Sequence, residues 1–218
     1  MNFIKKFPSW FMFLLYLNSS IIAQNSSKNE SDSNMLSGFQ IGGNLSAISH
    51  NSTSNIGLNI GLYWDYSLSK ISDLQIELWY IQKGSLWKWG DSHVNYYITY
   101  FQLPIYYSLT LLKNKNSNKL LNIQSGFYLS YAISRESESV YEYYGRTGNI
   151  SVENIIKKYD YGISFGLQIF TKNNIFIRLI YDHGLSNIIK TSENLTPVDA
   201  SKAKMWSLIL YIGYEGYY

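Results

Sequence analysis

Strict alternation of apolar and polar residues is the feature of this sequence that most restricts its fold. In residues 56–68, "IGLNIGLYWDYSL", every even position is apolar or aromatic, and the odd positions hold glycine, asparagine, aspartate, serine and one tyrosine. Side chains that alternate with a period of two lie on opposite faces of a β-strand. Each such strand therefore has one apolar face and one face that is small or polar.

The same alternation recurs along most of the chain. The segments are longer than the roughly 5 or 6 residues of an ordinary strand and match the roughly 9 to 11 residues that cross a bilayer at a tilt. Within 97–111 the apolar residues change from even to odd positions, so the sequence does not assign one apolar face to this strand. Pro104 lacks a backbone N–H donor and predicts a bulge there. The eight predicted strands are residues 38–48, 56–68, 73–83, 97–111, 120–134, 158–170, 174–186 and 203–218.

The connections between these strands alternate in character. Short turns at one end and longer loops at the other are typical of outer-membrane β-barrels, whose short turns face the periplasm. We therefore predict an all-β fold, an eight-stranded antiparallel up-and-down transmembrane β-barrel, over residues 36–218. The short or polar connections are 69–72, 112–119 and 171–173, and the others are 84–96, 135–157 and 187–202, with a brief link at 49–55.

The distribution of residue types decides which face meets lipid. In a soluble lipocalin-like barrel the apolar face points inward. Its outer face would then hold Gly57, Gly61, Gly162 and Gly166 and too few lysines and glutamates for a solvated surface. Small residues suit a narrow barrel interior instead, and aromatic girdles mark the two membrane interfaces. The predicted girdles are Tyr80, Tyr131, Tyr159, Tyr161, Tyr181 and Trp206 near the outer rim, and Phe39, Trp64, Tyr66, Tyr107, Tyr214 and Tyr218 near the periplasmic rim.

The N-terminus predicts export to the outer membrane of a Gram-negative bacterium. Lys5 and Lys6 precede the apolar stretch "WFMFLLYL" and the small residue Ala23, which is the pattern of a signal peptide over residues 1–23. The apolar stretch is too short for a spanning helix. Residues 24–35 have no apolar pattern, and we expect a flexible segment there.

Composition narrows the classes of partner and chemistry. Charged residues make up 15% of the chain, the net charge is only +3, and cysteine is absent. The small net charge gives no reason to expect nucleic acid, and the lack of cysteine excludes disulfides and thiolate chemistry. The partners expected of such a barrel are outer-membrane lipid, lipopolysaccharide and the outer-membrane assembly machinery.

Six short segments carry a resemblance to a known family. Over roughly residues 36–218 the chain resembles the PorT-like outer membrane protein beta-barrel domain. The resemblance implies an eight-stranded outer-membrane barrel and, because the family's namesake is an accessory of the type IX secretion system, a secretion-complex protein as partner. The segments are "IELWYIQKG" (76–84), "FQLPIYYSL" (101–109), "SGFYLSYAI" (125–133), "DYGISFGLQIF" (160–170), "YDHGLSNI" (181–188) and the closing "SLILYIGYEGYY".

The candidate chemical motifs are not expected to form an enzyme or a metal site. "DHGLSNI" is similar to the His-x-Ser-Asn site of lipid A deacylases, but His183 and Ser186 are three residues apart and point to opposite faces of a strand. His50, His93 and His183 lie near the exterior rim without a shared carboxylate. We predict a non-enzymatic protein without metal or cofactor, with a structural, assembly or binding role through its exterior loops. The alternative is a narrow pore or transporter for small solutes, which an interior filled by side chains opposes.

Charged residues on the inward parity predict a structural network in the lumen. Arg178 and Glu77 lie at similar heights on opposite sides of a narrow barrel, and an isolated buried charge is costly, so we expect them to pair. A second layer is expected around Lys83. The predicted network is Glu77, Arg178, Asp65, Lys83, Asp160 and Asp182, with Asp65 or Tyr63 beside the first pair and Asp182 or Asp160 as the partner of Lys83.

The last predicted strand carries the expected membrane-insertion signal. Its apolar parity ends in aromatic residues, of which Tyr214 and Tyr218 are the candidates that the assembly machinery reads. Deleting Tyr217 and Tyr218 is expected to lower insertion strongly. Heat-modifiable gel migration measures the folded fraction, and a normal amount of folded barrel in the deletion would contradict the assignment.

Overall fold

The structure is a computed structural model that describes most of the predicted barrel. The predicted signal peptide, residues 24–34, His50 and Tyr218 lie outside the described residues. In the part of the chain that is described, no helix is long and apolar enough to cross a membrane. The described residues are 35–48, 52–89, 92–113, 119–141, 146–150, 156–171, 174–190 and 203–217.

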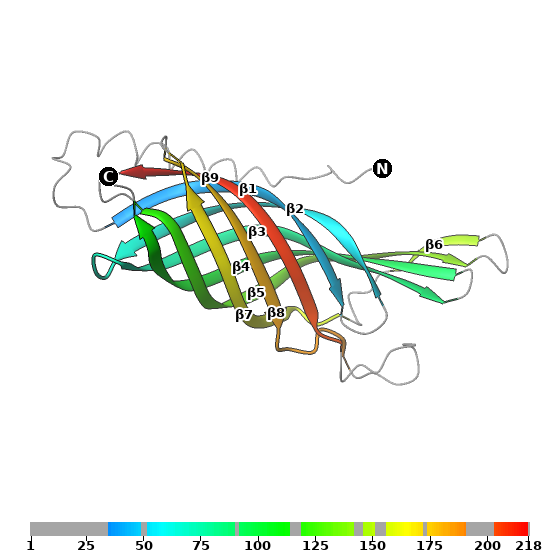
Figure 1. Ribbon diagram of the computed structural model, residues 1–218. Helices are drawn as coiled ribbons and strands as arrows, with labels where there is room; N and C mark the ends of the chain where they lie inside the picture. The colour runs from blue at the N-terminus through cyan, green and yellow to red at the C-terminus, as the bar shows by residue number, and fades with distance from the viewer. Residues whose placement is uncertain are drawn as a thin grey trace.

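The described strands form one closed antiparallel barrel (Figure 1). Consecutive strands pair from β1 to β5, β5 then pairs with β7 as well as β6, and β1 pairs with β9 to close the ring. Eight strands, all except β6, make the barrel, which confirms the predicted fold. The strands are β1 Met35–Ile48, β2 Ser52–Ser67, β3 Ser72–Trp89, β4 Ser92–Lys113, β5 Lys119–Tyr141, β6 Arg146–Ile150, β7 Tyr159–Phe170, β8 Ile175–Gly184 and β9 Met205–Tyr217.

The two faces of the barrel wall are divided as the alternation predicts. On β7, Tyr161, Phe165 and Ile169 are each 53% exposed on the outside, whereas Ser164 and Gln168 are buried inside. An apolar exterior of this kind is stable in lipid and unfavourable in water. Below, the end that carries the short turns is called the periplasmic end, and the opposite end is called the exterior end.

Strands β3, β4 and β5 run further toward the exterior than predicted. The expected connection 84–96 is a hairpin that extends β3 and β4, and the expected loop 135–157 contains the end of β5 and all of β6. Figure 1 shows these strand ends extending past the barrel on the side where β6 lies. The part made of residues 84–89, 92–98, 135–141 and 146–150 is called the projecting sheet.

The polar character of this region explains why its strands were predicted as loops. Trp87, Val94 and Tyr96 alternate on one buried face of the projecting sheet, but charged and polar residues dominate the rest. A sheet that leaves the membrane no longer needs an apolar outer face. The pattern that identified the membrane strands is therefore absent there, although backbone pairing continues.

Strand β4 keeps one phase throughout, and the predicted bulge at Pro104 is wrong. Pro104 pairs with Tyr128 in unbroken register. The register of β4 against β5 shifts elsewhere. One shift lies between Thr99 and Tyr100, where Ile133 of the neighbouring strand has no partner, and the others lie between Thr110 and Lys113 at the end of β4. Near the exterior end, the residues of β4 that point into the lumen are apolar or aromatic, namely Tyr96, Ile98 and Tyr100. The sequence therefore shows apolar residues on both parities of this strand.

Crowding inside the barrel predicts a large effect of adding one methyl group. A Cβ at Gly213 would lie 2.1 Å from the ring of Phe176, which Tyr63 and Phe170 hold at ring-centroid distances of 5.4 and 6.0 Å. Gly213→Ala is expected to lower the free energy of unfolding by about 1–3 kcal/mol, since overpacking forces neighbours to shift.

The matched control for this change is Gly43→Ala on the outer face. The nearest heavy atom to a Cβ there is 3.6 Å away, so the change is expected to stay within about 0.5 kcal/mol. Urea unfolding of both variants in lipid vesicles measures the difference. Equal effects at the two glycines would show that the lumen is not tightly packed at Phe176.

Candidate functional site

The middle of the lumen holds an ion pair between β8 and β3. Arg178 donates from Nη1 and Nη2 to Oε1 of Glu77, and both side chains are fully buried. Trp79 Nε1 donates to the second carboxylate oxygen at 2.5 Å, and Arg178 Nη1 also donates to Gln40 Oε1 at 3.1 Å. The guanidinium lies 4.9 Å from the ring centroid of Tyr106. Each buried charge thus has several partners, which offset part of its desolvation cost.

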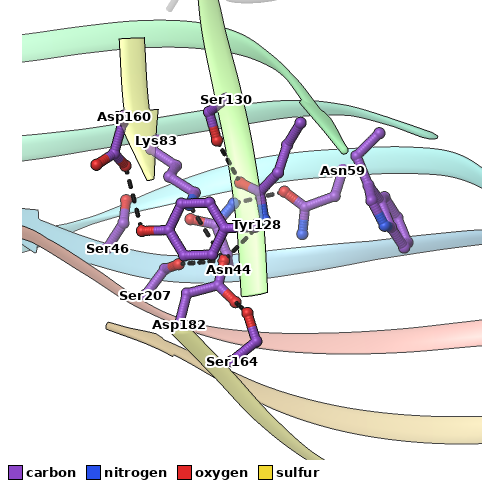
Figure 2. A network of polar contacts seen from close by, with 12 residues as sticks. Asn44, Ser46, Asn59, Lys83, Tyr128, Ser130, Asp160, Ser164, Asp182 and Ser207 are labelled. Carbon is purple, nitrogen blue, oxygen red and sulfur yellow. Dashed lines mark hydrogen bonds and ion pairs between the residues drawn. The ribbon is translucent and has the colours of Figure 1, made fainter. Parts of the chain in front are cut away.

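A second charged layer lies closer to the exterior (Figure 2). Lys83 Nζ pairs with Asp182 Oδ2 at 3.2 Å, and both side chains are fully buried. Asp182 also accepts hydrogen bonds from Gln102 Nε2 at 2.9 Å and Ser164 Oγ at 2.6 Å. Ser207 Oγ adds a longer contact at 3.4 Å. Of the two partners predicted for Lys83, the structure places Asp182 in the ion pair.

Asp160 lies beside this layer and is satisfied by neutral donors. Its carboxylate accepts hydrogen bonds from Ser186 Oγ at 2.6 Å and Tyr128 Oη at 3.2 Å. Tyr128 contacts both charged side chains, because Lys83 Nζ lies 4.7 Å from its ring centroid and its hydroxyl reaches Asp160 (Figure 2). Asp160 therefore belongs to the network through hydroxyl groups and not through an ion pair.

Asp65 lies in a third layer at the periplasmic end and not beside the central pair. Lys119 Nζ contacts Asp65 at 3.2 Å and Asp73 at 2.5 Å. Tyr63 donates to the backbone carbonyl of Tyr214 at 3.4 Å. Lys119 was not among the predicted network residues, because the sequence places it in a polar turn, whereas β5 begins at this residue. Asp73 lies on the inward parity of its strand, and this position could have predicted the third layer.

Further polar and aromatic side chains lie in the lumen between and beyond these layers. Gln124 Nε2 donates to Gln75 and Gln168 at 2.6 and 2.8 Å, and Trp79 stacks on Tyr211 at a centroid distance of 4.1 Å. Apolar side chains of one buried cluster gather at the exterior end and are called the apolar cap. They are Ile48, Trp87, Val94, Ile156, Ile188, Ile189, Ala203 and Met205.

The histidine and serine of the deacylase-like motif lie on different sides of the wall. His183 Nδ1 is 3.4 Å from Tyr181 Oη on the outside, whereas Ser186 bonds to Asp160 in the lumen. The two side chains therefore do not form a catalytic pair. Among the residues that the structure describes, no three His, Cys, Asp or Glu side chains are grouped to hold a metal ion.

The described part of the candidate insertion signal faces lipid. Tyr214 is 44% exposed and its ring centroid lies 6.2 Å from that of Phe39 on β1. Leu210 and Ile212 continue the same outer face along β9. An aromatic residue at this end of the barrel fits the periplasmic girdle.

The family of the chain follows from one of the comparisons with known proteins. A profile of the outer membrane protein beta-barrel domain matches residues 19–190, without singling out a PorT-like subgroup. No curated protein matches the chain. Among solved structures, Ail of Yersinia pestis in complex with the heparin analogue sucrose octasulfate shares 12% identity over 84% of this chain and 99% of its own, with a TM-score of 0.47.

Two further solved barrels are similar at the same level. Neisserial surface protein A has 12% identity and a TM-score of 0.46, covering 85% of this chain and 98% of its own. The N-terminal barrel of Pseudomonas aeruginosa OprF has 12% identity and a TM-score of 0.38, and the match covers 84% of this chain and 97% of the OprF barrel. Likeness at this level carries no argument about function.

Proposed function

Because this chain belongs to the outer membrane protein beta-barrel domain family, we propose that it is a non-enzymatic outer-membrane protein that binds a protein partner outside the cell. The observation that carries the proposal is the projecting sheet. Among the described strands, β6 pairs with β5 alone and stands last in the sheet order. The unpaired edge of such a strand can add a strand from another chain through backbone hydrogen bonds.

The contents of the lumen support a binding role over transport. The interior is occupied from the middle to the exterior end. It holds the two buried ion-pair layers, the stack of Trp79 on Tyr211 and the apolar cap. Eight strands enclose a space that side chains fill, whereas aqueous channels need about 16 strands.

The partner that we propose is a component of a secretion complex, in line with the PorT-like resemblance. The test replaces residues 138–149 with a short turn, which removes the outer part of the β5–β6 hairpin and leaves the barrel pairing of β5 intact. Crosslinking in intact cells, followed by purification of the barrel, is expected to recover a secretion-complex protein with the full chain and not with the shortened one.

The control replaces residues 114–118, which join β4 to β5 at the periplasmic end, and is expected to keep the crosslink. Heat-modifiable migration shows that all three proteins are folded. An identical set of crosslinked proteins from the full and shortened chains would contradict the proposal.

Planar-bilayer recording separates binding from the alternative function as a narrow pore. We expect no conductance steps from the purified barrel, because the Arg178–Glu77 pair and the apolar cap close the lumen. Reproducible single-channel steps, absent from a protein-free control, would favour the pore and contradict the proposed role.

A further inference from the structure

Three exposed lysines gather at the exterior end of the barrel wall. Lys157 and Lys158 directly precede β7, and Lys190 follows Ile188 and Ile189 of the apolar cap, after the end of β8. The backbones of these segments are joined, because Ile156 bridges to Ile189 and Lys157 N donates to Ile188 O at 2.7 Å. Lys158 is held to β5 by a hydrogen bond from Ala132 N to its carbonyl, also 2.7 Å. The three lysines are called the rim lysines.

The rim lysines stand next to the exterior aromatic girdle. Tyr159 follows them immediately, is 60% exposed, and packs on Tyr131 at a centroid distance of 5.3 Å. Tyr161 and Tyr181 continue the girdle on the same outer surface, at 53% and 41% exposure. Because such tyrosines lie at the level of the lipid headgroups, the lysines beside them lie at or just above the outer-leaflet headgroups.

Charge is segregated across the wall in this region. The carboxylates at the exterior ends of β7 and β8, Asp160 and Asp182, point into the lumen and are bonded there to Ser186 and Lys83. Among the described residues, no carboxylate forms an ion pair with any rim lysine. Among the described residues of this region, the three rim lysines are exposed to the outside, whereas Asp160 and Asp182 are buried in the lumen.

We propose that the rim lysines bind the phosphate groups on the sugar headgroup of the outer-leaflet glycolipid. Lysine is a point-charge donor to phosphate, and the neighbouring tyrosine rings cover the boundary between sugar and acyl chains. A lysine near a membrane surface strengthens attraction to anionic lipid by roughly fivefold, so three acting together contribute on the order of a hundredfold. The site uses the barrel wall and does not depend on the partner proposed for the projecting sheet.

The test compares two triple variants in detergent micelles. One carries Lys157→Gln, Lys158→Gln and Lys190→Gln, and the control removes three exposed lysines elsewhere, with Lys70→Gln, Lys88→Gln and Lys113→Gln. Titration with bisphosphorylated lipid A is expected to give similar affinities for the wild type and the control and roughly hundredfold weaker binding for the rim variant.

Two further ligands identify the source of the phosphate. Dephosphorylated lipid A is expected to bind the wild type as weakly as bisphosphorylated lipid A binds the rim variant. Inorganic phosphate at millimolar concentration is expected neither to bind measurably nor to compete. Equal binding of the two lipids, or tight binding of inorganic phosphate, would overturn a glycolipid site.

Folding is checked for each variant by heat-modifiable migration. A triple Lys→Arg variant, which keeps the charge, is expected to bind as the wild type does. If the triple variant does not fold, single Lys→Gln variants provide the result. Each is expected to bind bisphosphorylated lipid A roughly fivefold more weakly than the wild type does. Unchanged affinity in the rim variant, or an equal loss in the control, would overturn the proposal.

Discussion

Arg178→Ala is expected to lower the free energy of unfolding by about 3–5 kcal/mol, because it leaves a buried carboxylate without its cation. Glu77 would keep Trp79 as a donor but lose both contacts from the guanidinium, and neither side chain is exposed to water. Urea unfolding of the barrel in lipid vesicles measures the loss.

The double variant with Glu77→Gln separates the ion pair from the packing of the arginine. Glutamine removes the orphaned charge and still accepts a hydrogen bond from Trp79, so the double variant is expected to recover part of the loss. The coupling free energy in this cycle is expected to be about 1–3 kcal/mol. Lys113→Ala, an exposed lysine at the periplasmic end, is the control and should have little effect. Strictly additive losses would mean that the two charges are solvated separately.

The side of the wall on which each residue lies could be predicted from the sequence. A strand in a closed barrel has no freedom to change faces, because a slip of one residue would place polar groups in lipid. Parity therefore assigned Arg178, Glu77, Lys83 and Asp182 to the lumen. Distance from the strand end then gave Arg178 and Glu77 similar heights, and the structure places them in contact.

The position of a residue around the barrel could not be predicted in the same way. Strands tilt and stagger as the barrel closes, so two residues at one height can meet or lie apart depending on the shear. Parity therefore left Asp160 and Asp182 equivalent as partners of Lys83, although only Asp182 pairs with it. It also left Asp65 a candidate for the central layer, whereas Lys119 contacts it at the periplasmic end.

The projecting sheet marks a second limit. Outside the membrane, neither lipid nor a filled lumen imposes alternation on both faces. Trp87 and Val94 still face a buried cluster, but one apolar face in a polar hairpin is a weak signal. The region that carries the proposed function is therefore the part of the fold that the sequence pattern describes least.

The two lumen aspartates of the upper layer are expected to differ sharply in their contribution to stability. Asp182 pairs with the Lys83 ammonium group at 3.2 Å and accepts hydrogen bonds from the neutral donors Ser164 and Gln102 at 2.6 and 2.9 Å. Asp182→Ala leaves the buried ammonium without a counter-charge, and the expected loss is about 3–5 kcal/mol. Asp160→Ala orphans only the hydroxyls of Ser186 and Tyr128, and the expected loss is about 1–3 kcal/mol.

A compensating change shows whether the orphaned ammonium causes the larger loss. Lys83→Met in the Asp182→Ala background removes the buried charge and keeps most of the side-chain volume, so it should restore part of the stability. The same Lys83→Met change in the Asp160→Ala background should lower stability further, because it orphans Asp182. Urea unfolding of these four variants in lipid vesicles gives both comparisons. The contrary result would be equal losses for Asp182→Ala and Asp160→Ala, with no rescue by Lys83→Met. It would mean that Lys83 is shared between the two carboxylates and that its pairing with Asp182 is not the dominant one.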